Sequence, residues 1–83
     1  EITITLEEIV EIAAKKLKNG GRLCMCQRTE RLADAIYEMR KNNLEPVKLQ
    51  FVTSGQSEKP YLFLIEGRKG IKPQFFVAEN IKN

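Results

Sequence analysis

The fold is decided by the stretch Val47-Lys48-Leu49-Gln50-Phe51-Val52, the polar segment 54–60 and the run Tyr61-Leu62-Phe63-Leu64-Ile65. The first run alternates apolar and polar residues as far as Phe51, which predicts a strand with one covered face at the edge of a sheet. The second run is apolar throughout, so we expect a strand inside the sheet that is buried on both faces. The polar segment joins the two runs as a loop, which predicts an antiparallel hairpin.

The residues at the start of the chain predict a helix over 6–18. Thr5 is placed to cap its first turn, and Glu8 completes a capping box. The segment Asn19-Gly20-Gly21 then stops the helix, because Asn and Gly tolerate a positive φ. The apolar residues recur with the period of a helix that buries one face; they are Leu6, Ile9, Val10, Ala13 and Leu17.

A strand over 23–27 follows, and its residues 23–26 are apolar without alternation. We therefore expect it to be covered on both faces, as in a sheet with helices on each side. Cys24 and Cys26 would point to the same face and are interpreted as small hydrophobic core residues. A metal site would need further soft ligands, which the sequence does not supply, so no metal ligand is assigned. Since the sequence carries no disulfide framework, a reducing cytoplasm is the expected compartment.

A second helix begins directly behind this strand, with Thr29 as its expected N-cap and Asn42-Asn43 as its end. The order helix, buried strand, helix, edge strand, buried strand predicts an α/β fold. Because the two buried strands should be neighbours, the expected spatial order is 23–27, then 61–65, then 47–52. The two outer strands would be parallel and joined by a right-handed crossover, with 61–65 antiparallel between them.

This arrangement leaves one edge of strand 23–27 without a partner, and two helices do not suffice to cover both faces of the sheet. The sequence thus predicts half of an α/β sheet, with two helices and three strands, partly open on one side. The chain starts at Glu1 instead of Met, so we expect the missing half to lie N-terminal to it. The tail from 71 contains a short apolar run, 75–77, and receives no assigned structure.

The length and composition of the chain limit which classes of function it can have. A chain of 83 residues makes one domain at most. Fourteen Lys and Arg residues against eleven Asp and Glu residues give a net charge of +3, which permits an anionic partner without requiring one.

The absence of His excludes a Ser-His-Asp triad, a Cys-His pair and a zinc site with His ligands within this chain. The apolar runs fall far short of the roughly 20 residues of a membrane-spanning helix, so no membrane partner is expected.

Four motifs follow one another along the chain: Gly20-Gly21-Arg22-Leu23, Gln27-Arg28-Thr29-Glu30-Arg31-Leu32, Leu44-Glu45-Pro46 with Leu49-Gln50-Phe51-Val52, and Leu64-Ile65-Glu66-Gly67-Arg68-Lys69-Gly70 with Lys72-Pro73. With these motifs, residues 3–73 resemble the C-terminal portion of S-adenosylmethionine-dependent methyltransferases. The most similar branch has a "methyltransferase small" domain and includes the bacterial tRNA(Val) adenine N6-methyltransferases. The resemblance assigns 1–73 to the C-terminal part of such a domain and leaves the tail 74–83 unassigned.

The resemblance implies a Rossmann-like sheet whose last three strands are ordered fifth, seventh, sixth, with the seventh antiparallel. It also implies that the parent protein transfers a methyl group from S-adenosylmethionine to an adenine amine of tRNA. The Gly-rich cofactor turn and the Asn-Pro motif that such enzymes use are missing from these residues. We therefore assign no catalytic and no cofactor-binding residue, and expect the chain alone to be inactive and to bind no cofactor.

Three cations are expected on the rim where the active site of this family opens. Arg28 and Arg31 follow the carboxyl end of strand 23–27, and Lys59 lies in the loop after strand 47–52. Positive groups there would contact tRNA phosphates, although ordinary solvated surface charges account for the same residues. Two further hypotheses stay open: a freestanding small α/β module that binds RNA or a protein partner, and a half-domain that pairs with itself or with another chain through its open sheet edge.

Overall fold

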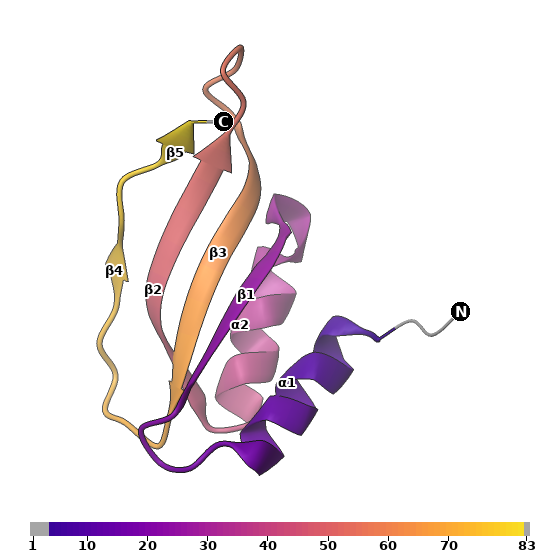
Figure 1. Cartoon of the computed structure of the whole chain (residues 1–83), viewed down its shortest axis with the longest axis vertical. Helices are drawn as coiled ribbons and strands as arrows, with labels where there is room; N and C mark the ends of the chain where they lie inside the picture. Colours follow the sequence, from indigo (N-terminus) through magenta and orange to yellow (C-terminus); the bar gives the residue numbers. More distant parts are fainter. Residues whose placement is uncertain (1–3, 83) are drawn as a thin grey trace.

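A computed structural model describes residues 4–82 and places two helices against one face of a single sheet (Figure 1). The sheet has the strand order β1-β3-β2-β4, and β5 pairs with β2 beyond β4. The elements, in chain order, are α1 (Leu6–Lys16), β1 (Arg22–Arg28), the short 3-10 helix η1 (Thr29–Arg31), α2 (Leu32–Lys41), β2 (Leu44–Thr53), β3 (Pro60–Lys69), β4 (Phe76–Val77) and β5 (Ile81–Lys82).

The predicted arrangement of the three long strands is confirmed. β3 pairs antiparallel with β1 on one side and with β2 on the other, so β1 and β2 are parallel. Ile65 lies at the centre of the sheet, opposite Met25 of β1 and Leu49 of β2. The helix α2 connects β1 to β2, as the crossover prediction requires.

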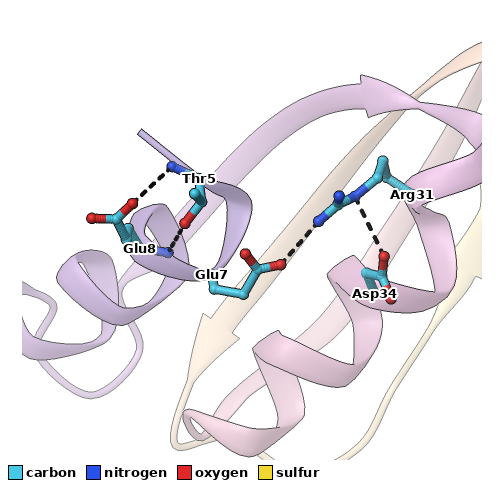
Figure 2. A network of polar contacts seen from close by, with 5 residues as sticks. All are labelled: Thr5, Glu7, Glu8, Arg31 and Asp34. Atoms are coloured by element: carbon cyan, nitrogen blue, oxygen red, sulfur yellow. Dashed lines mark hydrogen bonds and ion pairs between the residues drawn. The ribbon is translucent and has the colours of Figure 1, made fainter. Parts of the chain in front are cut away.

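The start of α1 is held by the capping box that the sequence predicts (Figure 2). The Glu8 amide donates to Thr5 Oγ1 over 3.1 Å, and the Thr5 amide donates to Glu8 Oε1 over 3.1 Å. The helix ends at Lys16, two residues before the predicted 18, because Leu17 adopts an extended backbone with φ −81° and ψ 141°. Gly20, with φ +86°, then turns the chain toward β1.

The expected cap of the second helix is wrong. Thr29 opens η1 instead, and α2 begins only at Leu32. The Leu32 amide donates to the Thr29 carbonyl, so a tight turn of backbone satisfies the first donor in place of a capping side chain. The predicted end is confirmed: Asn42 is the C-cap, and Asn43 follows with φ +63°.

The core lies between the helices and the inner face of the sheet. Val10 of α1, Met39 of α2 and Phe63 of β3 are fully buried there. The α2 helix approaches β3 so closely that a Cβ atom built on Gly67 would lie 3.0 Å from Met39 Sδ. Gly67 therefore leaves the space that this helix needs against the sheet.

The strand 47–52 is not the outermost one, because the tail runs along its outer side (Figure 1). β4 and β5 pair in parallel with β2, and the Ala78 amide donates to the Leu49 carbonyl over 2.8 Å. The Gln50 side-chain amide donates to the Glu79 carbonyl over 2.8 Å. The unassigned tail thus extends the sheet by two short strands.

The expectation that the strands 23–27 and 61–65 are buried on both faces is wrong, because the helices cover one face only and Leu62 and Leu64 of β3 stay half-buried on the other. Only Met25 of β1 is buried, whereas Cys24 and Cys26 are both exposed. Both helices pack on the face to which Met25 points, so the alternate residues of β1 lie on the opposite, uncovered face. The two cysteines are consequently not core residues in this structure.

Candidate nucleic-acid interface

The carboxyl ends of β1 and β2 lie at the same end of the sheet, because the two strands are parallel. There the chain leaves β1 at Arg28, enters η1, and later forms the loop 54–59 between β2 and β3. This loop projects beyond the strand ends (Figure 1). We call this region the rim, and it brings Arg28, Arg31 and Lys59 to one end of the molecule.

Arg28 occupies the last position of β1 and is exposed. It lies opposite Leu62 of β3, on the same uncovered face as Cys26. Among residues 4–82 its guanidinium takes part in no ion pair and no hydrogen bond that would compensate its charge. Arg28 therefore presents a full positive charge at the junction of the rim and the open face.

Arg31 is held by two carboxylates, as Figure 2 shows. Its Nη2 donates to Glu7 Oε1 of α1 over 2.9 Å, and its Nε lies 3.4 Å from Asp34 Oδ2 of α2. These contacts fasten η1 to the first turns of both helices. Because two acidic groups already compensate the guanidinium, Arg31 offers less to a phosphate than Arg28 does.

Lys59 lies in the loop between β2 and β3 and is exposed. The loop is held by bonds within itself: the Lys59 amide donates to Ser57 Oγ over 3.1 Å, and the Ser57 amide donates to the Ser54 carbonyl over 3.3 Å. The Lys59 ammonium enters no ion pair with the part of the chain that the structure describes. The rim therefore carries two uncompensated cations, Arg28 and Lys59.

Two other cations, Arg68 and Lys69, have structural partners at the opposite end of the sheet. Arg68 Nε and Nη2 donate to the Gly20 carbonyl over 3.2 and 2.9 Å. Lys69 Nζ donates to the carbonyls of Ala14 and Leu17 at the end of α1. The sequence contains only weak signals for these contacts, because the partners are about fifty residues apart.

The glycine turn between α1 and β1 does not fit S-adenosylmethionine. A cofactor site of this kind uses free backbone amides in a glycine-rich turn after a strand. The turn at Gly20 and Gly21 follows a helix, and its amides are already used: Gly20 donates to the Lys69 carbonyl over 2.7 Å and Gly21 to the Lys18 carbonyl over 2.8 Å. This turn is a connection between α1 and β1, and we assign it no ligand.

The uncovered face of the sheet is hollowed over β1 and β3. The hollow has a volume of about 300 Å³. One row of cross-strand neighbours runs from Cys24 through Glu66 to Lys48, and the next runs from Cys26 through Leu64 to Gln50. β1 is also the last strand on its side, and its outer edge pairs with no strand within residues 4–82.

No protein-family model and no curated protein sequence matches the chain. Among solved structures, the fold is similar to the crystal structure of a predicted O-methyltransferase from Agrobacterium tumefaciens, with a TM-score of 0.80 and 15% sequence identity. The match covers 93% of this chain and 36% of that chain. Neither helix in the described part of the chain is long and apolar enough to cross a membrane. The chain thus has a methyltransferase-like α/β fold and spans about a third of the length of that structure.

Proposed function

We propose that the chain is the C-terminal part of an S-adenosylmethionine-dependent methyltransferase that acts on an adenine amine of tRNA. The observation that carries the proposal is the sheet order β1-β3-β2 with an antiparallel β3, in a fold shared with a predicted methyltransferase over 93% of the chain. The choice of an adenine amine rests on the sequence motifs from Gly20-Gly21-Arg22 to Lys72-Pro73, and the choice of RNA also on the cations of the rim.

In this proposal the rest of the domain contacts the chain along β1 and over the part of the open face that lies beside β1. The free edge of β1 would receive a further strand, and the hollow beside Cys24, Cys26 and Leu64 would receive side chains from a covering layer. That part would also supply the cofactor turn and the groups that hold the adenine. The 83 residues would then complete the sheet and contribute one side of the substrate surface.

The rim supplies the charge that orients the RNA. Arg28 and Lys59 would contact phosphates, which fix the position of a substrate without reading its bases. Arg31 would act as a positioning residue, since its hydrogen bond to Glu7 and its ion pair with Asp34 hold the turn that follows Arg28. Such a surface favours a long polyanion over a small neutral acceptor.

The test uses the complete gene product that contains these residues, incubated with S-adenosylmethionine and unmodified tRNA transcripts. Digestion of the tRNA and mass spectrometry of the nucleosides should detect N6-methyladenosine. If only ribose hydroxyls or only small-molecule hydroxyls are methylated, an adenine amine is not the methyl acceptor and the proposal is refuted. Methylation that does not depend on the added tRNA would exclude RNA as the substrate.

A matched pair of variants tests the rim. Arg28→Ala removes the uncompensated cation at the rim, whereas Arg22→Ala removes an exposed arginine on the same face at the other end of β1. We expect Arg28→Ala to weaken tRNA binding about threefold to tenfold and to lower the slope of log affinity against log salt by about one. Arg22→Ala should change both quantities less.

The second candidate function, a freestanding module that binds RNA or a protein, is favoured by the open face with its two exposed thiols. It predicts that the isolated chain is a stable monomer whose open face stays accessible. The half-domain hypothesis predicts instead that the isolated chain associates with itself or loses its tertiary structure. Analytical ultracentrifugation together with thermal unfolding of the chain separates the two.

A further inference from the structure

A second hollow, of about 400 Å³, lies at the far edge of the sheet between β2, β3 and the tail. It is separate from the rim and shares only Glu66 with the hollow over the open face. It is lined by two phenylalanines, a valine and three polar residues that carry a carboxylate, a guanidinium and an amide group. These residues are Val47, Glu66, Arg68, Gln74, Phe75 and Phe76. Phe75 is 51% exposed and Phe76 is 58% exposed, although large aromatic side chains are usually covered.

The register explains why the ring of Phe76 stays exposed. Phe76 pairs with Lys48 and lies on the uncovered face, where neither helix reaches it. Phe75 precedes β4 and lies between this hollow and a smaller one formed with Ile36, Arg40 and Pro46. Phe76 therefore faces the hollow from the uncovered side of the sheet, whereas Phe75 also contacts the smaller hollow beside α2.

We propose that this hollow binds an unpaired base of a single-stranded RNA segment. Exposed aromatic rings are stacking surfaces for bases. The Gln74 amide both donates and accepts hydrogen bonds, and the Glu66 carboxylate accepts bonds from an exocyclic amine. The volume of the hollow suits one nucleotide better than it suits a helix or a strand of a protein partner. We call it the base-stacking site.

The cations around the base-stacking site are placed to meet the sugar-phosphate backbone. Arg68 has its guanidinium plane fixed by its bonds to Gly20, and hydrogen bonds among the described residues leave its Nη1 unused. Lys48 lies directly beside Phe76 in the sheet, and Lys72 is exposed two residues before Gln74. An exposed aromatic ring next to cations is a combination by which proteins hold single-stranded nucleic acid.

The base-stacking site and the rim can hold two parts of one RNA. From Lys48 to Thr53 the strand β2 spans about 17 Å, at roughly 3.3 Å per residue. This distance is covered by a few nucleotides of extended RNA. The inference extends the proposed function, on which it rests for the identity of the RNA, but binding of a base at Phe75 and Phe76 is measurable without methyl transfer.

The direct test is a tryptophan reporter. The chain contains no Trp, so Phe76→Trp introduces a single fluorophore at the base-stacking site. Titration with a single-stranded RNA of about twelve adenylates should quench its fluorescence, because a base stacks on the ring. An abasic ribose-phosphate strand of equal length and charge should bind at least about tenfold more weakly and quench little. Equal binding and equal quenching by both strands would overturn the proposal.

A pair of variants in the complete gene product provides the second test. The double substitution of Phe75→Ala and Phe76→Ala should weaken binding of the same RNA about tenfold or more, with little change in the salt slope. Tyr37→Ala is the matched control, because Tyr37 is an aromatic residue that is 63% exposed on α2, beside Lys41. Its RNA affinity should change less than about twofold. Similar effects of the two variants would overturn the proposal.

The outcomes distinguish this inference from the proposed function. Methyl transfer to tRNA without quenching at residue 76 would refute the base-stacking site alone. Quenching by RNA in a protein that methylates no RNA would refute the proposed function alone. If the double substitution instead abolishes self-association of the chain and leaves RNA affinity unchanged, the surface is an interface between copies and the base-stacking site is refuted.

Discussion

Lys69 Nζ donates a hydrogen bond of 2.9 Å to the carbonyl oxygen of Leu17, so the last residue of β3 caps the end of α1. The same ammonium group also donates to the carbonyl of Ala14. The last carbonyls of a helix lack partners within it, and the helix dipole favours a cation beside them. One side chain thereby fastens the first helix to the end of the central strand.

Replacement of Lys69 should therefore destabilise the fold. Lys69→Met keeps the length of the side chain but removes the donor, and should lower the free energy of unfolding by about 1–2 kcal/mol. The control is Lys72→Met, because Lys72 is exposed three residues further on. Chemical denaturation of both variants measures the effect. Equal losses of stability would mean that the cap contributes nothing specific.

The capping box should make the free energy of unfolding depend on pH. The pKa of Glu8 is lowered from its ordinary value, first by the hydrogen bond with the Thr5 backbone and then by the bond with the Thr5 side chain. A carboxyl group with a lowered pKa in the folded state stabilises that state above its ordinary pKa and loses this contribution as the pH falls through its folded pKa. Glu8→Gln should therefore be less stable than the natural chain at pH 7, with the difference vanishing in acid.

Thermal unfolding of the two proteins across a pH series checks this expectation. Glu11→Gln is the control, since Glu11 is exposed on the same helix outside the capping box. A stability difference for Glu8→Gln that grows as the pH falls would contradict the capping account.

The close approach of α2 to β3 predicts the effect of a larger residue at Gly67. Gly67→Val places new atoms against Met39, which is fully buried and has little room to move. We expect a loss of about 1–3 kcal/mol in the free energy of unfolding. Met39→Ala should reduce the additional cost of Gly67→Val, because the two positions share one space. If the losses in the free energy of unfolding are additive in the double variant, the contact between residue 67 and Met39 is not the cause of the Gly67→Val effect.

The exposed thiols test whether the rest of the proposed domain covers the open face. In the isolated chain Cys24 and Cys26 should both react with Ellman's reagent, and Cys24→Ala should change the free energy of unfolding by less than about 0.5 kcal/mol. In the complete gene product the covering layer should slow the reaction at least about a hundredfold, by analogy with the protection of buried groups. Rapid labelling in both proteins would refute the proposed covering of the open face.

The sequence allowed prediction of the strand order and the hairpin, because two apolar runs joined by a polar loop favour an antiparallel pair, and a helix between two strands favours a parallel crossover. It did not reveal that one face of β1 is bare. The apolar residues of 23–26 suit burial on both faces, but a short apolar run contains no information on whether a covering layer is present. The same run in a larger domain would be interpreted in the same way.

The pairing of the tail strands and the partners of the cations cannot be predicted from the sequence, for a different reason. β4 and β5 have two residues each, which is too short for a periodic pattern, and their pairing with β2 depends on contacts distant in the sequence. Arg31 was expected at the rim and lies there, but its ion pair with Glu7 joins residues that are 24 positions apart. The roles of Arg28, Arg31 and Lys59 in RNA binding remain predictions.

The most direct test of the central claim is calorimetric titration of S-adenosylmethionine into two proteins: this chain and the complete gene product that contains it. The account predicts stoichiometric binding to the complete protein. It predicts no saturable binding to the chain below about 100 μM, since a dissociation constant in that range requires roughly 5 kcal/mol of specific binding that these residues do not supply. Saturable binding to the chain alone, or no binding to the complete protein, would contradict the claim that this is the cofactor-free C-terminal part of a methyltransferase.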